Sequence, residues 1–318
     1  MKIFLKVHSL FGKGVPGFFL IAKKRSPLRR VLAGVLIYFA FFAIVSQMHH
    51  HKKTQFDNKA IRVYSQLSVR NPEKAVKLIP DPQALFAPEK PNIFNPSAVF
   101  FSLFSFPEVH SEGVKTLKHF IAMFKENLSG VDLSELDLSG KGMDFSGANF
   151  SHANLTRANF GSANLAGANL SGANLTEADL SGVDLIGAVL RGTNLSRADL
   201  NRAILTKADL SKAVLREARI ADADLSRANL FFADLSGIIL RSSRLVGADL
   251  SGVTLYHADL IATDLSRARL SGADLNGADL RYANLTHTTG LNQAQLDRGI
   301  VDEMTKLPPG LSRSKTVK

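Results

Sequence analysis

A five-residue periodicity in the second half of this 318-residue chain constrains its fold more than any other feature. From Phe145 to Leu285, all 29 residues at intervals of five are large and apolar: 25 Leu, three Phe and Ile220. The residue two places earlier is Ala in 22 repeats, and the residue just before the Leu or Phe is Asn or Asp in 21. Three further leucines extend the pattern upstream, before a two-residue insertion at Lys141–Gly142: Leu128, Leu133 and Leu138.

A period of five fits neither an α-helix nor a flat strand. One large and one small inward residue per five suit a chain that turns a corner in every repeat. Stacked coils of such a chain would place Leu over Leu and Ala over Ala in a continuous interior, and each coil would be stabilised only by its neighbours. The periodicity therefore predicts an all-β solenoid.

The repeat units carry a recognisable consensus. Ala163-Asn164-Leu165-Ala166-Gly167 and Ala273-Asp274-Leu275-Asn276-Gly277 match the pattern A(D/N)Lxx, and in this the chain resembles the pentapeptide-repeat family of bacterial proteins. The resemblance covers nearly half of the chain and implies a right-handed quadrilateral β-helix with four repeats per coil. With the upstream repeats it implies about eight coils, roughly 38 Å long at ~4.8 Å per coil.

Four repeats per coil would place residue n next to residue n+20, and the charged residues agree with this spacing. Arg157, Glu177, Arg197 and Glu217 alternate in sign down one such column. Opposite charges on neighbouring strands are favourable. The same spacing pairs Arg219 with Asp199, Arg244 with Asp224 and Asp264, Arg269 with Asp249, and Arg202 with Asp222.

Open coil ends expose unpaired backbone, so both ends of the solenoid (128–289) require covers. Residues 112–127 place apolar side chains at helical spacing and predict an N-terminal capping helix; they are Val114, Leu117, Phe120, Ile121 and Phe124. Residues 290–318 predict a C-terminal cap and tail, with a helix that starts after Asn292, turns Leu296 and Ile300 inward and ends near Pro308.

The net charge of +11 belongs almost entirely to the N-terminal part of the chain. Residues 1–142 carry 20 Lys+Arg and 10 Asp+Glu (+10), residues 143–287 carry 14 and 15 (−1), and residues 288–318 carry 5 and 3 (+2). Residues 1–30 contain eight basic residues and no acidic one, and they predict a basic cytoplasmic leader. An amphipathic helix at residues 2–13 on an anionic leaflet and a disordered leader fit equally well.

A transmembrane helix is predicted at Val31–Met48, because no residue in this apolar run carries a charge. At ~1.5 Å per residue this helix spans ~27 Å, close to the thickness of a hydrocarbon core. A cleaved signal peptide fits less well, because the apolar run is long and no A-x-A site follows. Eight basic residues precede the helix and four follow within about 15 residues, so we expect the N-terminus in the cytoplasm and the repeats in the periplasm of a bacterial inner membrane.

Residues 49–111 contain seven of the eleven prolines and predict a Pro-rich spacer. His49–His51 begin this spacer. Adjacent residues cannot all converge on one ion without an unusual backbone, so we interpret them as a polar end to the membrane helix and expect no metal site.

The sequence offers no enzyme chemistry. The chain has no cysteine, which excludes disulfides, thiol catalysis and Cys-ligated metals. A Leu and Ala interior supplies no convergent ionisable groups, so we expect no catalytic residue, no cofactor and no metal.

Two anomalies on outward positions suggest an interaction surface instead. Phe231 and Phe232 are large apolar residues where the repeats are otherwise polar. Lys207, Arg227, Arg267 and His287 fall in one column without an acidic residue.

The sequence hypothesis is therefore a non-enzymatic, membrane-anchored scaffold that binds an unknown protein partner at the cell envelope. The family resemblance implies one alternative, a topoisomerase-binding DNA mimic that protects gyrase, although such mimicry requires a strongly acidic rod. A secreted effector that targets host membranes is a further alternative. No nucleic-acid partner is expected of a nearly neutral rod, and homo-oligomerisation stays open.

Overall fold

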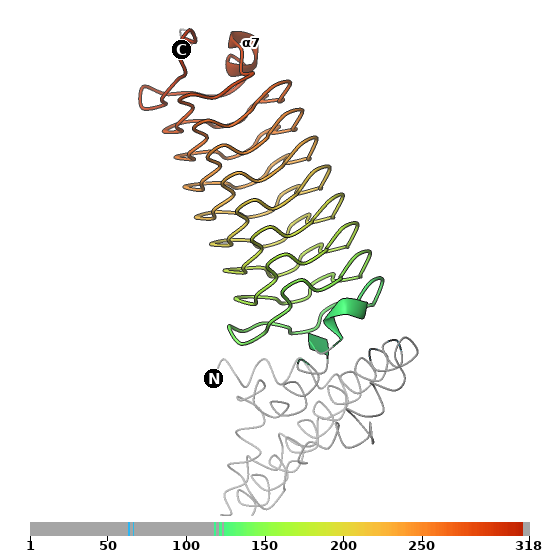
Figure 1. Ribbon diagram of the computed structural model, residues 1–318. Coiled ribbons are helices and arrows are strands. Elements are labelled where there is room, and N and C mark those ends of the chain that lie inside the picture. Colours follow the sequence, from blue (N-terminus) through green and yellow to red (C-terminus); the bar gives the residue numbers. More distant parts are fainter. Residues whose placement is uncertain (1–62, 64–65, 67–117, 119–120, 123, 314–318) are drawn as a thin grey trace, which may run out of the picture. The chain divides into compact units, whose positions relative to one another are not determined.

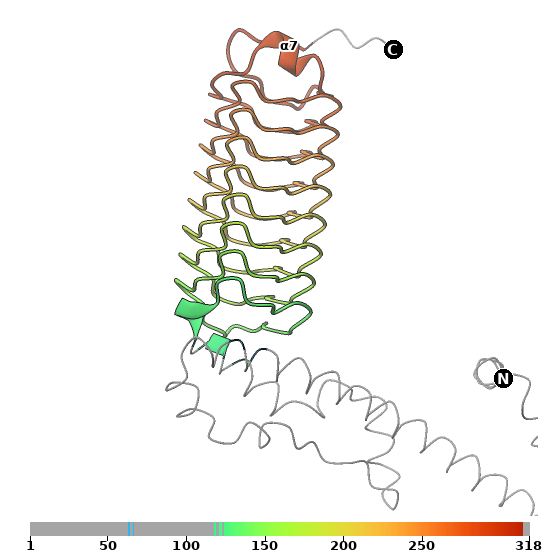
Figure 2. The same cartoon turned by 90° about the vertical axis from the view of Figure 1, so that its right-hand side faces the viewer.

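The computed structural model describes residue 63, residue 66, residue 118, residues 121–122 and residues 124–313. All of these belong to one compact unit, formed by Ala60–Leu85 and Val114–Lys318. Within it, the repeats form stacked coils, which we call the rod (Figures 1 and 2). The predicted solenoid is thus confirmed as the architecture of the repeats.

Each repeat turns one corner of a coil. At a representative corner, the carbonyl of Phe150 accepts a hydrogen bond from the N–H of Ala153 at 3.0 Å, and His152 between them has φ +56°. Every fifth residue from Gly147 to His287 has such a positive φ. A four-membered turn with positive φ only at its third position follows the type II pattern. We call this third position the corner position.

Where Asn or Asp precedes the core Leu, all five backbone N–H groups of a repeat can be satisfied, and three of them bind neighbouring coils. In the repeat 173–177, Ala173 donates to the Leu170 carbonyl (3.0 Å), Asn174 to Ala153 (2.9 Å), Leu175 to Asn194 (2.7 Å), Thr176 to the Asn174 side chain (3.2 Å) and Glu177 to Ser196 (3.0 Å). The side-chain acceptor explains why Asn and Asp are the most frequent residues before Leu: their oxygen accepts the N–H of the residue just before the corner position, which no carbonyl reaches.

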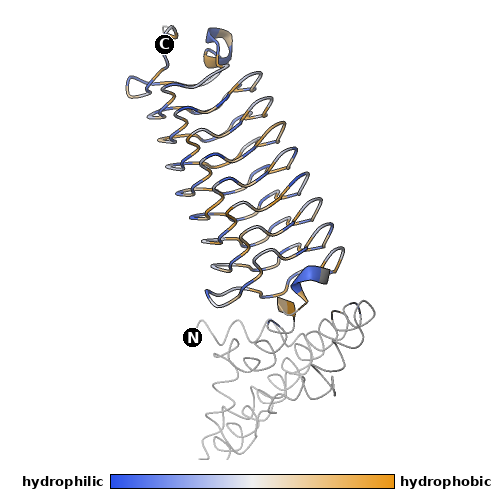
Figure 3. Cartoon of the chain, in the orientation of Figure 1, coloured by the Kyte–Doolittle hydropathy of each residue, from blue (hydrophilic) through white to orange (hydrophobic). Residues whose placement is uncertain are grey.

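The register between coils is constant through the main run. From Asp144↔Asn164 to Arg269↔Thr289, parallel single-residue bridges connect residue n to residue n+20, so one coil holds four repeats, as predicted. Below the insertion the register becomes n to n+22, as in Asp132↔Asn154. Hydrophobic and hydrophilic residues alternate along every coil (Figure 3).

The interior consists of stacked Leu and Ala, with every Leu of the main run buried. Phe145, Phe150 and Phe160 pack edge-to-face near the N-terminal end, with ring centroids 5.6–5.8 Å apart. Where Thr replaces Ala, its hydroxyl binds a turn carbonyl of the coil below: Thr193 donates to Leu170 (2.7 Å) and Thr263 to Leu240 (2.9 Å). These polar exceptions in the Ala column therefore cost no unsatisfied group.

The N-terminal edge of the rod is covered by residues from two segments. Helix η3 (Lys125–Asn127) supplies the Lys125 carbonyl, which accepts the N–H of Asn149 at 2.7 Å. Ile121 and Phe124 are fully buried, as the predicted cap requires. The prediction did not anticipate the contribution of the predicted spacer: Val63 is fully buried and the Gln66 side chain accepts the N–H of Asp132 at 3.1 Å.

The C-terminal cap differs from its prediction. Helix α7 (Gln293–Leu296) does start after Asn292, which closes a capping box with Gln295, and Leu296 is buried. The expectations that the helix runs to Pro308 and that Ile300 points inward are wrong. Ile300 is exposed and bridges Asp279, because its N–H and carbonyl extend the backbone ladder of the last coil instead of a helix.

The predicted leader (1–30), the predicted membrane helix (Val31–Met48) and most of the predicted spacer lie outside the described residues. Within the part of the chain that the structure describes, we find no helix with the length and apolar character needed to cross a membrane.

Shortening one interior Leu tests the stacking. Leu225 is fully buried, so Leu225→Ala should lower the free energy of unfolding by roughly 2–5 kcal/mol. The matched control is Lys212→Ala at an exposed corner position, where Ala262 shows that Ala is tolerated; its effect should stay within about 0.5 kcal/mol. Urea unfolding followed by circular dichroism measures both, and equal losses would contradict the stacked core.

Candidate interaction surface

The four residues of the predicted column without acidic residues share one edge of the rod. Lys207, Arg227, Arg267 and His287 occupy the same corner in different coils, with φ values of 60–61°, and all four are exposed. Gly247 takes this corner between Arg227 and Arg267, and a Cβ placed on it would lie 3.9 Å from Cγ of Arg227. We call these four residues the basic column.

Another corner shows that this fold can pair its charges. There Arg157 contacts Glu135 at 3.3 Å and Glu177 at 3.2 Å, and Arg197 contacts Glu177 at 3.8 Å and Glu217 at 3.0 Å. We call this run the alternating column. It confirms the predicted alternation and adds Glu135, which the wider register below the insertion brings into line.

The side chains of the basic column have no acidic neighbours of this kind in their own column. Within the described part of the chain, neither Lys207 nor Arg227 nor Arg267 forms an ion pair. Like charges on neighbouring strands repel each other, and glycine, which occupies this corner in other coils, would avoid the repulsion. The rod therefore retains an unneutralised line of positive charge that its folding does not need.

The two predicted phenylalanines form a fixed pair on the next corner of the same coil as Arg227. Phe231 and Phe232 are 41% and 58% exposed, and their rings meet edge-to-face with centroids 4.4 Å apart. The Phe232 ring covers Gly252 of the following coil, where an added Cβ would lie 2.9 Å from its Cε1. Ser251, one coil beyond Phe231, is 8% exposed and its hydroxyl has no hydrogen-bond partner among the described residues.

An unsatisfied buried hydroxyl destabilises a fold. The phenyl pair thus leaves apolar surface in solvent beside the buried Ser251 hydroxyl. The six predicted surface residues consequently lie on two adjacent corners of the rod, and the structure does not gather them into one patch.

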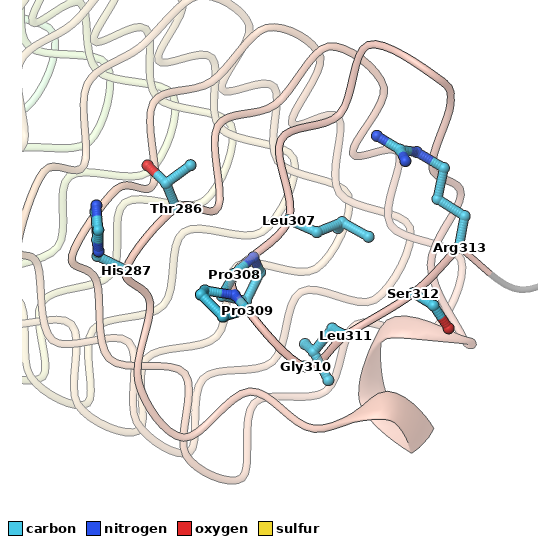
Figure 4. A pocket seen from close by; sticks show the side chains of 9 residues that line it. All are labelled: Thr286, His287, Leu307, Pro308, Pro309, Gly310, Leu311, Ser312 and Arg313. Carbon is cyan, nitrogen blue, oxygen red and sulfur yellow. The ribbon is translucent and has the colours of Figure 1, made fainter.

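At its C-terminal end the basic column meets a cleft. His287 and Thr286 line it together with Leu307–Arg313, and its volume is about 640 Å³ (Figure 4). The Arg313 guanidinium holds the far side by donating to the carbonyls of Glu303 (3.0 Å) and Thr305 (2.6 Å). His287 therefore belongs both to the basic column and to the cleft.

The structure also contains ion pairs that the n+20 rule did not predict. Arg191, Arg216 and Arg241, each just after a core Leu, bind carboxylates of the next coil, namely Asp209, Asp234 and Asp259. A sequence signal for them exists: Val-Leu-Arg or Ile-Leu-Arg recurs at 189–191, 214–216 and 239–241. The motif recurs every 25 residues, which is one coil of 20 plus one repeat of five. Each successive Arg–Asp pair therefore lies one coil further along the rod and one corner further around it.

Of the remaining predicted charge pairs, only one brings its side chains within ion-pair distance among the described residues. Arg269 lies 3.8 Å from Asp249. Asp199↔Arg219, Asp224↔Arg244 and Arg244↔Asp264 are backbone bridges, but within the described residues no ion pair joins their side chains, nor those of Arg202 and Asp222. Adjacent register is thus not enough; the side chains must also reach each other.

No metal chemistry emerges from the described residues: none of their His, Asp and Glu side chains gather in groups of three that could hold an ion. His152 and His257 lie over Gly172 and Gly277, where an added Cβ would come within 2.7 Å and 2.5 Å of their Nδ1 atoms. His49–His51 lie outside the described residues.

Comparisons with known proteins follow the repeats. The sequence model of a family described as pentapeptide repeats matches this chain in overlapping stretches that together run from residue 127 to residue 289. No curated protein matches.

Among solved structures, the chain is similar to HetL, a pentapeptide repeat protein involved in heterocyst differentiation regulation from the cyanobacterium Nostoc sp. strain PCC 7120. The two are 32% identical over 60% of this chain and 89% of HetL, with a TM-score of 0.35. QnrB1, a plasmid-mediated fluoroquinolone resistance protein, is 23% identical over 57% of this chain and 85% of its own, with a TM-score of 0.29. Rfr23 from the cyanobacterium Cyanothece 51142 is 28% identical over 52% and 90%, with a TM-score of 0.22.

We call the pairs of Arg191, Arg216 and Arg241 with carboxylates of the next coil the diagonal ion pairs. They predict a specific loss of folding stability at acidic pH. Burial raises the pKa of Asp234, but hydrogen bonds from Ser236 and Arg216 outweigh it and hold the pKa below its ordinary 3.8. A carboxylate with a lowered pKa stabilises the fold above the ordinary value, and this stability is lost as the pH falls through the folded-state value. Arg216→Ala should therefore shift acid unfolding to higher pH.

Circular dichroism during acid titration measures the shift, and ¹³C NMR of the carboxyl group should show a higher pKa for Asp234. Arg219→Ala removes a guanidinium that forms no ion pair within the described residues, and it should leave the Asp234 titration unchanged. An identical shift in both variants would refute the local cause.

Proposed function

Because this chain belongs to the pentapeptide-repeat family, we propose that it is a non-enzymatic scaffold that binds a protein partner through the basic column and the Phe231–Phe232 pair. Pentapeptide repeat proteins are generally structural or interaction proteins. The single observation that carries the proposal is the unpaired basic column beside a fold that pairs charges elsewhere. Exposed aromatic and Arg side chains are the residue types that most often dominate binding at protein interfaces.

The proposal includes a membrane anchor at Val31–Met48, with residues 1–30 in the cytoplasm and the repeats in the periplasm of a bacterial inner membrane. The length and lack of charge of this stretch support the anchor, and the eight basic residues before it support the orientation. Residues 49–111 would then act as a spacer between the membrane and the rod.

We further propose that the rod is a right-handed quadrilateral β-helix of about eight coils, covered at both ends by its short helices. The count follows from 32 repeats at four per coil, and the handedness is that implied by the family. The candidate surface lies on these coils and not on the end covers, apart from His287 at the margin of the cleft.

The alternatives require different surfaces. A topoisomerase-binding DNA mimic needs a strongly acidic rod, whereas residues 143–287 carry 14 basic and 15 acidic side chains. A secreted effector that targets host membranes is compatible with an apolar segment, but nothing in the described residues favours it over the scaffold.

Topology mapping tests the anchor. In a bacterial host, alkaline phosphatase fused after Lys318 should be active and green fluorescent protein at the same site should be dark, because the first needs the periplasm and the second the cytoplasm. The reverse pattern would overturn the proposed orientation and favour the cytoplasmic topoisomerase alternative.

Cross-linking in cells tests the binding surface. Phe231→Ser with Phe232→Gly installs the Ser-Gly corner found at Ser251–Gly252, so the backbone should persist while partner adducts are lost. The matched control is Tyr256→Ser with His257→Gly: this pair also meets edge-to-face, at 4.2 Å, and also covers a glycine, Gly277.

The control variant should keep all adducts. If both double variants yield the same adducts as the unmodified chain, the phenylalanine pair is not part of an interface.

A further inference from the structure

Resting on the proposed function, we infer the chemistry of the partner: the basic column and the adjoining cleft bind an extended, acidic protein segment that ends in an apolar residue. The segment would run along the rod axis, with carboxylates on Lys207, Arg227 and Arg267. Its apolar residue would enter the cleft beside His287.

The residues of the basic column stand in one line along the rod axis. The column spans four coil spacings, from Lys207 to His287, which is about 19 Å at ~4.8 Å per spacing. An extended chain of about six residues covers that length at ~3.3 Å per residue, and its alternate side chains face the same way. A linear polyanion can therefore meet all of the cations at once.

Charged residues also lie on the two faces of the rod that flank the basic column. The face that precedes this corner carries Asp224, Arg244 and Asp264, and the face that follows it carries Asp209, Asp249 and Arg269. On the second face, Asp209 pairs with Arg191 and Asp249 lies 3.8 Å from Arg269. A broad anionic object, such as a lipid bilayer or a DNA duplex, would meet these flanks of mixed charge together with the column and would find no further line of positive charge there. A narrow peptide touches the projecting corner alone, so the charge pattern favours a peptide over a membrane surface.

The cleft at the end of the basic column can hold the apolar residue of the segment. Its lining includes Leu307, Pro308, Pro309 and Leu311, and at about 640 Å³ it is large enough for an aliphatic side chain. These apolar side chains share the lining with Thr286, Ser312 and Arg313, so the open cleft offers both apolar surface and polar groups to a ligand. Because His287 lines the cleft and also ends the column, one continuous segment can occupy both.

Binding of fluorescein-labelled peptides to the full-length chain in neutral detergent provides the test. The probes are Glu-Ser-Glu-Ser-Glu-Ser-Leu and its reverse order, each with a version in which Gln replaces Glu and a version in which Ser replaces Leu. We expect one order of the acidic peptide to bind, and both substituted versions of it to bind at least about tenfold more weakly.

Matched variants locate the site. Lys207→Gly with Arg227→Gly should reduce affinity about tenfold or more and flatten its salt dependence. Arg157→Gly with Arg197→Gly removes the same charge from the same corner position of the alternating column, and it should change affinity less than about twofold. Leu311→Ser should erase the preference for the Leu peptide over its Ser version.

Three results would overturn the inference: equal loss of affinity in both double Gly variants, equal binding of the Gln peptide, or a Leu preference that survives Leu311→Ser. Vesicles of phosphatidylglycerol and a single-stranded oligothymidylate serve as competing ligands. If either binds more tightly than the peptide and depends on Lys207 and Arg227, the ligand class is wrong. Partner adducts that persist in cells despite such a result would leave the scaffold function standing and remove only its acidic-segment ligand.

Discussion

The hydrogen bonds between coils are the constraint on which the rest of the structure depends. Of the five N–H groups in a repeat such as 173–177, three bind the coil above or below, one closes the turn, and one binds the Asn side chain. No repeat can satisfy its backbone alone, which is the general condition of a solenoid. The ends of the rod show the same requirement: the Lys125 carbonyl, the Gln66 side chain and the backbone of Ile300 each serve a terminal coil.

The sequence was sufficient to predict the regular part of the fold because one pattern repeats 29 times, and nearly every repeat carries the same inward Leu. It was insufficient at the ends, where no pattern repeats. Ile300 lies at helical spacing from Leu296, but the chain continues the backbone ladder there. Gly299 lies close to Leu280: a Cβ added to this glycine would be 3.1 Å from Cδ1 of Leu280. Gln66 was unpredictable because its partner, Asp132, is distant in the sequence.

The candidate surface shows the same division. The positions of Lys207, Arg227, Arg267 and His287 followed from the n+20 register, which is a property of the backbone. Whether two side chains actually pair depends on reach, which the register does not determine: Arg157 and Glu177 meet, whereas Arg202 and Asp222 form no ion pair within the described residues. The cleft and the buried Ser251 hydroxyl arise from packing and left no signal in the sequence.

The chain combines a coil period of 20 residues with a 25-residue recurrence of the Arg-bearing motif, and these two periods bear on its origin. Copying a unit of five repeats reproduces its features one corner further around the rod, so the Arg–Asp diagonals could be inherited together by tandem duplication. Copying a unit of five repeats does not align a vertical column, whose members are separated by whole coils of four repeats.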